Sequence, residues 1–256
     1  MDIAEPLEKS ISVFEVRPGV TFPDLTVVRT PVARAALADI IKAFGIEKCF
    51  ANYDADQDRV RNSVLRSLAE RGRAPEIGEL AEDLELPSDT VADHLSALRK
   101  KDLVVFDTAQ GRLVGAYPLT ERQTEHRIEI GGQQSHAMCA IDALGTGAMF
   151  RQDIRITSSC RASGAPITIE TADAGTRIKS ADPDSAIVWS GIQVSDGVVA
   201  DSLCTVLAFF SSAQIFEEWR AGEHPHTPGY RLSLAEGIEV GGAIFKPFLA
   251  GIGPGA

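Results

Sequence analysis

Three helical segments followed by two short strands occupy residues 59–118, and this pattern constrains the fold of the 256-residue chain more than any other. The first segment, "RVRNSVLRSLAERGR", places apolar residues at helical spacing, and "PEIGELAEDLEL" and "PSDTVADHLSALRKKDLV" do the same. Ser88 is a natural N-cap for the third helix. "LVVFDTAQGRLVGAYPLT" then predicts two strands around a turn at Gly111. Three helices and a β-hairpin make a winged helix-turn-helix domain, which we place at residues 58–120.

The third helix of such a domain normally reads DNA, but its composition here disfavours that role. Its exposed side carries two acids among five polar residues, namely Ser88, Asp89, Thr90, Asp93 and His94. Arg99, Lys100 and Lys101 stand only at its far end. The whole chain has 25 basic and 36 acidic residues, a net charge of −11, and this balance weakens general affinity for a polyanion. We therefore do not expect nucleic acid as a partner, and a structural or dimerising winged helix fits at least as well.

The regions on either side of the winged helix have different predicted secondary structure. Residues 1–57 form an N-terminal extension in which a helix is expected over Val32–Ile46, with Pro31 in its first turn. Residues 121–256 mix short strands with helices, so the predicted fold class is α+β: a winged helix followed by a mixed α/β domain with a β-sheet core. No stretch of about 18 apolar residues suggests a membrane span, and the N-terminus lacks a signal-peptide pattern. We expect no membrane association and a cytoplasmic location.

A thiol and a carboxylate stand close together in the apolar segment "HAMCAIDAL". Cys139 precedes Asp142 by three residues, which on a predicted helix within residues 135–150 places both on one face. Burying an unpaired carboxylate is costly, so an acid in such a run indicates a function, unless it is an N-cap or is satisfied by backbone amides. It could transfer the thiol proton if a soft metal then stabilised the thiolate. His136, three residues before the thiol, would share that face, although a surface position is the simpler interpretation.

The other cysteines are scattered. The chain has four, at positions 49, 139, 160 and 204, with no CxxC pair, and each taken alone is most simply a buried, inert thiol. Cys160 lies in "ITSSCRASGAPITI" and Cys204 opens the apolar run "CTVLAFF". His224 and His226 could form a metal pair, but no third ligand is evident.

Three blocks in this order, "MCAIDAL", "ITSSCRASGAPITI" and "SLCTVLAFFSS…FEEW", resemble the organomercurial lyase (alkylmercury lyase) family. The resemblance covers roughly residues 60–250 and includes an N-terminal winged helix that does not bind DNA in that family. The sequence departs from the family pattern at Met138, Thr205 and Leu207, where an aromatic residue, a second cysteine and a histidine are common.

The resemblance implies protonolytic cleavage of a carbon–mercury bond by a catalytic domain at residues 121–256. Cys139 and Cys204 would bind mercury, and Asp142, adjoining the metal, would deliver the proton to carbon. The products would be a hydrocarbon and thiolate-bound Hg(II), which small thiols or a mercury reductase would remove. No organic cofactor is implied, Cys160 would be structural, and the role would be detoxification in mercury resistance. Cys49 receives no role.

Two other functions remain open at the level of sequence. The same Cys/Asp/Cys set could act on a different electrophile, such as a biosynthetic intermediate. Alternatively, the chain could be a soft-metal-responsive regulator that senses with its cysteines and binds DNA with its winged helix. The acidic third helix argues against the regulator.

Overall fold

The computed structural model describes residues 10–50, 53–193, 203–223 and 227–250. The N-terminal part forms a hairpin and two helices: β1 (Phe14–Arg17), β2 (Val20–Phe22), the 3-10 turn η1 (Leu25–Val27), α1 (Pro31–Phe44) and α2 (Ile46–Cys49). α1 begins where the Thr30 side chain accepts from the backbone N–H of Ala33, with Pro31 in the first turn. It ends at Gly45, whose φ of 63° is readily adopted by glycine. The expected helix is thus confirmed, with a break before Ile46.

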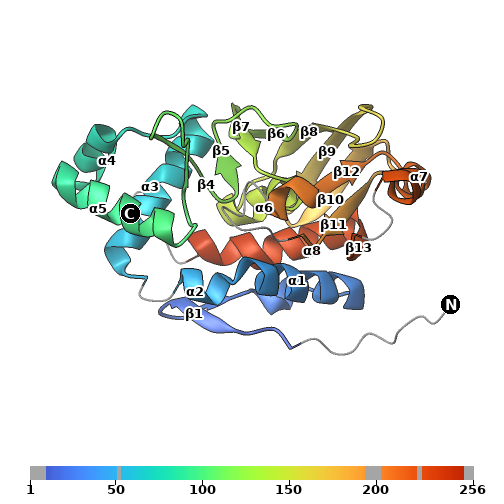
Figure 1. The fold of residues 1–256 in the computed structure, drawn as a ribbon, viewed down its shortest axis with the longest axis horizontal. Helices are drawn as coiled ribbons and strands as arrows, with labels where there is room; N and C mark the ends of the chain where they lie inside the picture. Colours follow the sequence, from blue (N-terminus) through green and yellow to red (C-terminus); the bar gives the residue numbers. More distant parts are fainter. Residues whose placement is uncertain (1–9, 51–52, 194–202, 224–226, 251–256) are drawn as a thin grey trace.

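The winged helix-turn-helix is confirmed: α3 (Ala55–Arg71), α4 (Ile77–Leu84), α5 (Ser88–Lys100), β3 (Val105–Phe106), β4 (Leu113–Ala116) and β5 (Leu119–Thr120). Asp54 caps α3 through a 2.7 Å hydrogen bond from the backbone of Gln57, an N-cap that the sequence analysis did not identify. Ser88 is the first residue of α5 and not its cap, because Pro87 occupies the N-cap position without a side-chain hydrogen bond. The helical unit lies at one end of the molecule, at the left of Figure 1.

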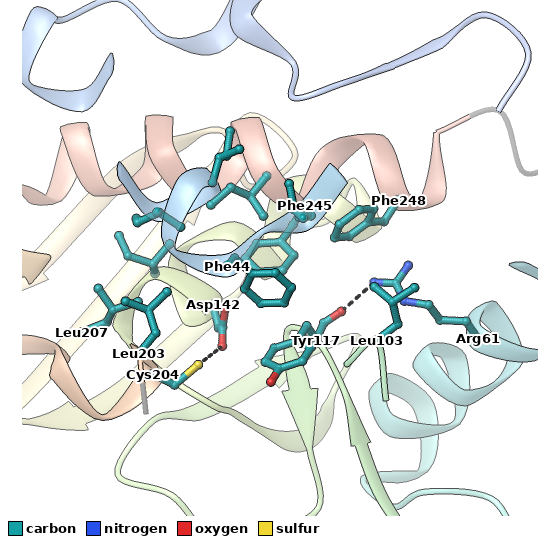
Figure 2. Close-up of a pocket in the computed structure, with 15 residues that line it drawn as sticks. Phe44, Arg61, Leu103, Tyr117, Asp142, Leu203, Cys204, Leu207, Phe245 and Phe248 are labelled. Atoms are coloured by element: carbon teal, nitrogen blue, oxygen red, sulfur yellow. Dashed lines mark hydrogen bonds between the residues drawn. The ribbon is translucent and has the colours of Figure 1, made fainter. Parts of the chain in front are cut away.

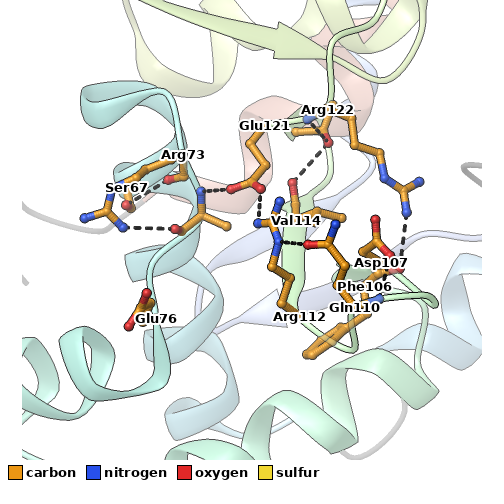
Figure 3. Close-up of polar contacts among 12 residues, drawn as sticks. Ser67, Arg73, Glu76, Phe106, Asp107, Gln110, Arg112, Val114, Glu121 and Arg122 are labelled. Carbon is orange, nitrogen blue, oxygen red and sulfur yellow. Dashed lines mark hydrogen bonds and ion pairs between the residues drawn. The ribbon is translucent and has the colours of Figure 1, made fainter.

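Polar side chains connect the wing, formed by strands β3, β4 and β5, to the helices (Figure 3). Glu121 accepts from the backbone N–H of Ala74 at 2.9 Å and pairs with Arg112. Arg112 also donates to the side chain of Gln110 at 2.8 Å. These contacts join the segment after α3 to the strands that follow α5, so the wing and the helices form one packed unit.

The wing strands do not end with the winged helix. They continue into an eight-stranded antiparallel sheet of order β10-β9-β8-β6-β7-β5-β4-β3, in which Leu119 of β5 pairs with Ala137 of β7. The added strands are β6 (Arg127–Ile130), β7 (Gln133–Ala137), β8 (Arg155–Ser159), β9 (Pro166–Ala172) and β10 (Arg177–Asp182). A smaller sheet has the order β12-β11-β13, formed by β12 (Leu207–Phe210), β11 (Ile187–Gly191) and β13 (Gly229–Ser233).

Two buried helices occupy the centre: α6 (Ala140–Phe150) and α8 (Leu234–Phe245). α6 contacts strands of both sheets on one side and α8 on the other, and α8 in turn contacts α1 (Figure 1). Residues 140–149 are all buried, so α6 lacks a solvent face. The remaining elements are η3 (Leu203–Val206), α7 (Ala213–Glu223) and η4 (Lys246–Leu249). No helix in the described ranges is long and apolar enough to span a membrane.

Candidate functional site

Cys139 is the N-cap of α6. Its backbone is extended (φ −154°, ψ 178°), continuing from β7, and its Sγ accepts from the backbone N–H of Asp142 at 3.4 Å. The helix expected within residues 135–150 is present as α6, but it begins after Cys139, and Ser135 and His136 belong to β7. Cys139 and Asp142 do not share a helical face. They meet because a side chain at the cap folds over the first turn.

Cys204 reaches the same point from a distant part of the chain. It lies in η3, just before β12, and its Sγ is 3.9 Å from Oδ2 of Asp142 (Figure 2). One ligand atom from each of Cys139, Asp142 and Cys204 lies within 4.8 Å of the other two, and no other such trio of metal-binding side chains occurs among the described residues. The structure thus brings together all three residues that the sequence analysis singled out.

The three groups are almost completely withdrawn from water. Cys139 is 0% exposed, Asp142 4% and Cys204 6%. Burial raises the pKa of Asp142 to about 7, so its protonated and ionised forms are both populated at neutral pH. Burial also raises the pKa of the Cys139 thiol. The hydrogen bond with Cys139 lowers the pKa of Cys204, but burial and the Asp142 carboxylate outweigh it and the net shift is upward. The resting site therefore holds two thiols beside a carboxyl group that can accept or give a proton.

A cavity of about 40 Å³ adjoins Asp142 and Cys204. Its volume is enough for roughly three water molecules, and its wall is almost entirely apolar. The N-terminal helices α1 and α2 supply part of this wall. A helix was expected over Val32–Ile46, but no role in the site was assigned to it. The lining side chains are Ile40, Ile41, Phe44, Ile46, Arg61, Leu103, Tyr117, Ile141, Asp142, Leu203, Cys204, Leu207, Ile244, Phe245 and Phe248.

The remaining candidates lie elsewhere. Cys160 is 1% exposed, and hydrogen bonds with Ser163 and Ser211 outweigh the opposing effect of burial and lower its pKa to about 7. Cys49 is buried, with its pKa raised to about 11 by burial. His136 is half-buried in β7, so it does not share a helical face with Cys139, the less favoured of the two interpretations of this residue. His224 and His226 lie outside the described residues.

Comparison with known proteins identifies the family. A sequence model of alkylmercury lyases matches residues 119–246, which is half of the chain. The chain belongs to the alkylmercury lyase family. An alkylmercury lyase of Staphylococcus epidermidis is 30% identical over 164 residues, which cover 64% of this chain and 72% of that protein. One of Streptomyces lividans is 26% identical over 190 residues, 74% of this chain and 84% of that protein.

Two further comparisons concern the fold. The crystal structure of the mercury-bound form of MerB2 superposes with a TM-score of 0.69 at 24% identity, covering 83% of this chain and 99% of that one. Residues 58–105 also match the model of the bacterial regulatory protein arsR family. The lyase-type fold therefore contains a helix-turn-helix of the kind that regulators use, as the sequence analysis predicted.

Proposed function

We propose that this chain is an organomercurial lyase that cleaves carbon–mercury bonds by protonolysis, with Cys139 and Cys204 as mercury ligands and Asp142 as proton donor. The observation that carries the proposal is the trio of ligand atoms within 4.8 Å, two of them soft sulfur atoms. Family membership supports it, as does the mercury-bound state of the related MerB2 structure. Cys160 is proposed to be structural, because it is buried away from the trio.

Asp142 connects the thiols to the carbon atom. A substrate R–Hg–X binds as a thiol transfers its proton to the Asp142 carboxylate, whose Oδ2 is 3.9 Å from Sγ of Cys204, and the sulfur displaces X from mercury. Each of the two thiols loses one proton when its sulfur binds mercury. One proton leaves with X, and the other passes through Asp142 to the carbon. The carbon–mercury bond breaks, R–H leaves, and two sulfur–mercury bonds remain.

The dry surroundings favour this transfer. Since burial raises the pKa of Asp142 to about 7, little free energy is needed to load or unload its proton near neutral pH. The apolar wall accommodates an alkyl group without competition from water. The scheme uses no organic cofactor.

We further propose that residues 121–256 form the catalytic domain and residues 58–120 the winged-helix domain. The extension at residues 1–57 would contribute to the wall of the cavity. Small thiols or a mercury reductase would accept the Hg(II), and the protein would act in the cytoplasm without nucleic-acid or membrane partners.

The experiment combines headspace analysis with mercury speciation. Purified protein is mixed with methylmercury and excess small thiol, and methane and Hg(II) are measured for wild type, C139S, C204S and D142N. Methane and Hg(II) in equal amounts from wild type only would support the proposal and its residues together. Tight mercury binding by wild type without hydrocarbon would refute the lyase and point to a sensor or sequestering protein.

A further inference from the structure

Arg61 is a fully buried cation at the edge of the cavity. It lies on α3, is 1% exposed, and is one of the residues that line the cavity next to Asp142 and Cys204. One of its nitrogen atoms, Nη2, donates to the backbone carbonyl of Tyr117 at 3.1 Å. The guanidinium carbon lies 4.3 Å from the centroid of the Phe248 ring. Its Nε and Nη1 are buried and have no hydrogen-bond partner.

Within the described part of the chain, no ion pair of 4.0 Å or less includes Arg61. The acid one turn earlier on α3, Asp58, is 2.5 Å from Nε of Arg17 and accepts from the Tyr53 hydroxyl at 2.8 Å. Two guanidinium groups therefore share one carboxylate in this region, and the excess positive charge lies on the more deeply buried of the two.

A buried guanidinium without a counter-ion destabilises a protein strongly, because neither water nor an anion replaces its lost hydration. The π-face of Phe248, the Tyr117 carbonyl and the neighbouring Tyr53 hydroxyl offset only part of this loss. An anion that reached the guanidinium through a small shift of the Arg61 side chain would find two N–H groups without a hydrogen-bond partner, in surroundings of low dielectric constant, where a charge-assisted hydrogen bond is strong.

Arg61 and two members of the trio, Asp142 and Cys204, lie at different places around the cavity. In Figure 2, Asp142 and Cys204 stand on one side, Arg61 stands on the other, and Tyr117 lies between them. A ligand in the cavity can thus present one end to Cys204 and Asp142 and the other to Arg61. With a volume of about 40 Å³, the cavity suits a short chain and not a bulky ring.

We propose that Arg61 binds the carboxylate of short carboxyalkylmercury compounds, so that the preferred substrates carry mercury at one end and an anionic group at the other. This inference rests on the proposed function for its kinetic consequence, but the anion site itself does not depend on turnover. Arg61 is a specificity residue in this scheme: it contacts the organic group and not the carbon–mercury bond.

The kinetic test compares two substrates of similar size that differ in charge, carboxyethylmercury and propylmercury. The readout is the ratio of their kcat/KM values, because a general change in the cavity would affect both substrates alike. We expect R61M to lower the ratio by about 10- to 100-fold, the range for losing charge-assisted hydrogen bonds. R61K, which keeps the charge, should give an intermediate ratio. The matched control is R59M, on the exposed side of the same helix, which should leave the ratio unchanged.

The binding test needs no activity. The side-chain Nε–H resonance of Arg61, assigned by its absence in R61K, is followed in the nuclear magnetic resonance spectrum as propionate or propionamide is added. A shift with propionate alone supports the anion site even if R61M fails to fold. If wild type cleaves neither mercurial but the resonance still shifts, the proposed function fails and the anion site stands. The inference would be overturned if the Arg61 Nε–H resonance did not shift with propionate. It would also be overturned if the ratio of kcat/KM values for the two substrates were equal in wild type and R61M.

Discussion

The backbone N–H of Asp142 donates to the Sγ of Cys139 at 3.4 Å, so one proposed mercury ligand is also the N-cap of the central helix α6. The thiol thus has a structural and a chemical role at the same position. Because α6 is buried along its length, its first turn cannot obtain replacement hydrogen bonds from water. Position 139 therefore offers a way to separate the two roles.

Replacing Cys139 by serine should preserve the fold, whereas alanine should not be tolerated as well. Serine is a strong N-cap and can accept from the Asp142 N–H, while alanine leaves that N–H buried without a partner. We expect C139A to lose about 1 kcal/mol more unfolding free energy in urea than C139S, and both to lose hydrocarbon release. Equal stability of the two variants would show that the cap contributes nothing.

The stability of the wild type should fall with rising pH in a way that D142N does not share. The pKa of Asp142 is raised from 3.8 in the unfolded chain to about 7 in the folded protein. Below the lower value both states are protonated and the stabilisation by the neutral acid is fully present. Between the two values the unfolded state ionises first, so unfolding becomes easier. The difference in unfolding free energy between D142N and wild type should grow by a few kcal/mol from about pH 4 to about pH 7 and then level off. A difference that stays constant over this window would contradict the raised pKa.

Adding a methyl group where α6 and α8 cross, by replacing Gly145 or Gly241 with alanine, should destabilise the protein. A Cβ at Gly145 would lie 2.6 Å from the carbonyl oxygen of Gly241, and a Cβ at Gly241 would lie 2.6 Å from the backbone nitrogen of Gly145. Since backbone atoms cannot turn aside, we expect G145A and G241A each to cost about 1–3 kcal/mol in thermal or urea unfolding. The control is G222A in α7, where nothing lies within 4 Å, so alanine should leave stability unchanged or raise it. Similar behaviour of all three variants would argue against close helix contact.

Arg17 should contribute far more to stability than an exposed arginine. It pairs with Asp58 at 2.5 Å, donates to the carbonyl of Ala250 at 2.6 Å, and also contacts the carbonyl of Phe248. These bonds connect the N-terminal hairpin to residues 248–250, next to the cavity. We expect R17A to lose about 3 kcal/mol of unfolding free energy and R59A, whose pair with Asp56 is about half exposed, less than 1 kcal/mol. A loss of less than 1 kcal/mol in R17A would show that the N-terminal hairpin is held by apolar contacts alone.

The winged helix should not bind DNA, despite its match to the arsR family of regulators. Asp89 and Asp93 are exposed on α5, where a regulator would present groups that contact bases and phosphates. In a gel shift with DNA from the protein's own locus at low salt, we expect no retardation with or without Hg(II). A retarded band that depends on mercury would support the regulator that the sequence left open.

The local structure followed from the sequence because it depends on neighbouring residues. Periodic apolar residues predicted α3, α4 and α5, and alternation around Gly111 predicted the wing. Near Cys139 the same method failed by a few residues: an apolar run is compatible with a buried strand and with a buried helix, and the pattern does not show where one gives way to the other. The three-residue spacing connected Cys139 with Asp142, but only the resemblance to alkylmercury lyases added Cys204, which no spacing rule would have connected to them.

Long-range pairing was decided only by the tertiary structure. Leu119 pairs with Ala137 and thereby continues the wing into the large sheet, which no local pattern encodes. The N-terminal helix supplies Ile40 and Phe44 to the cavity wall, although its sequence predicted only a helix. Arg61 reads in the sequence as an ordinary polar residue of α3, yet the other elements bury it completely. Apolar periodicity determines which surfaces must be buried, but the partner of each surface depends on the packing of the whole chain, and that packing creates the site.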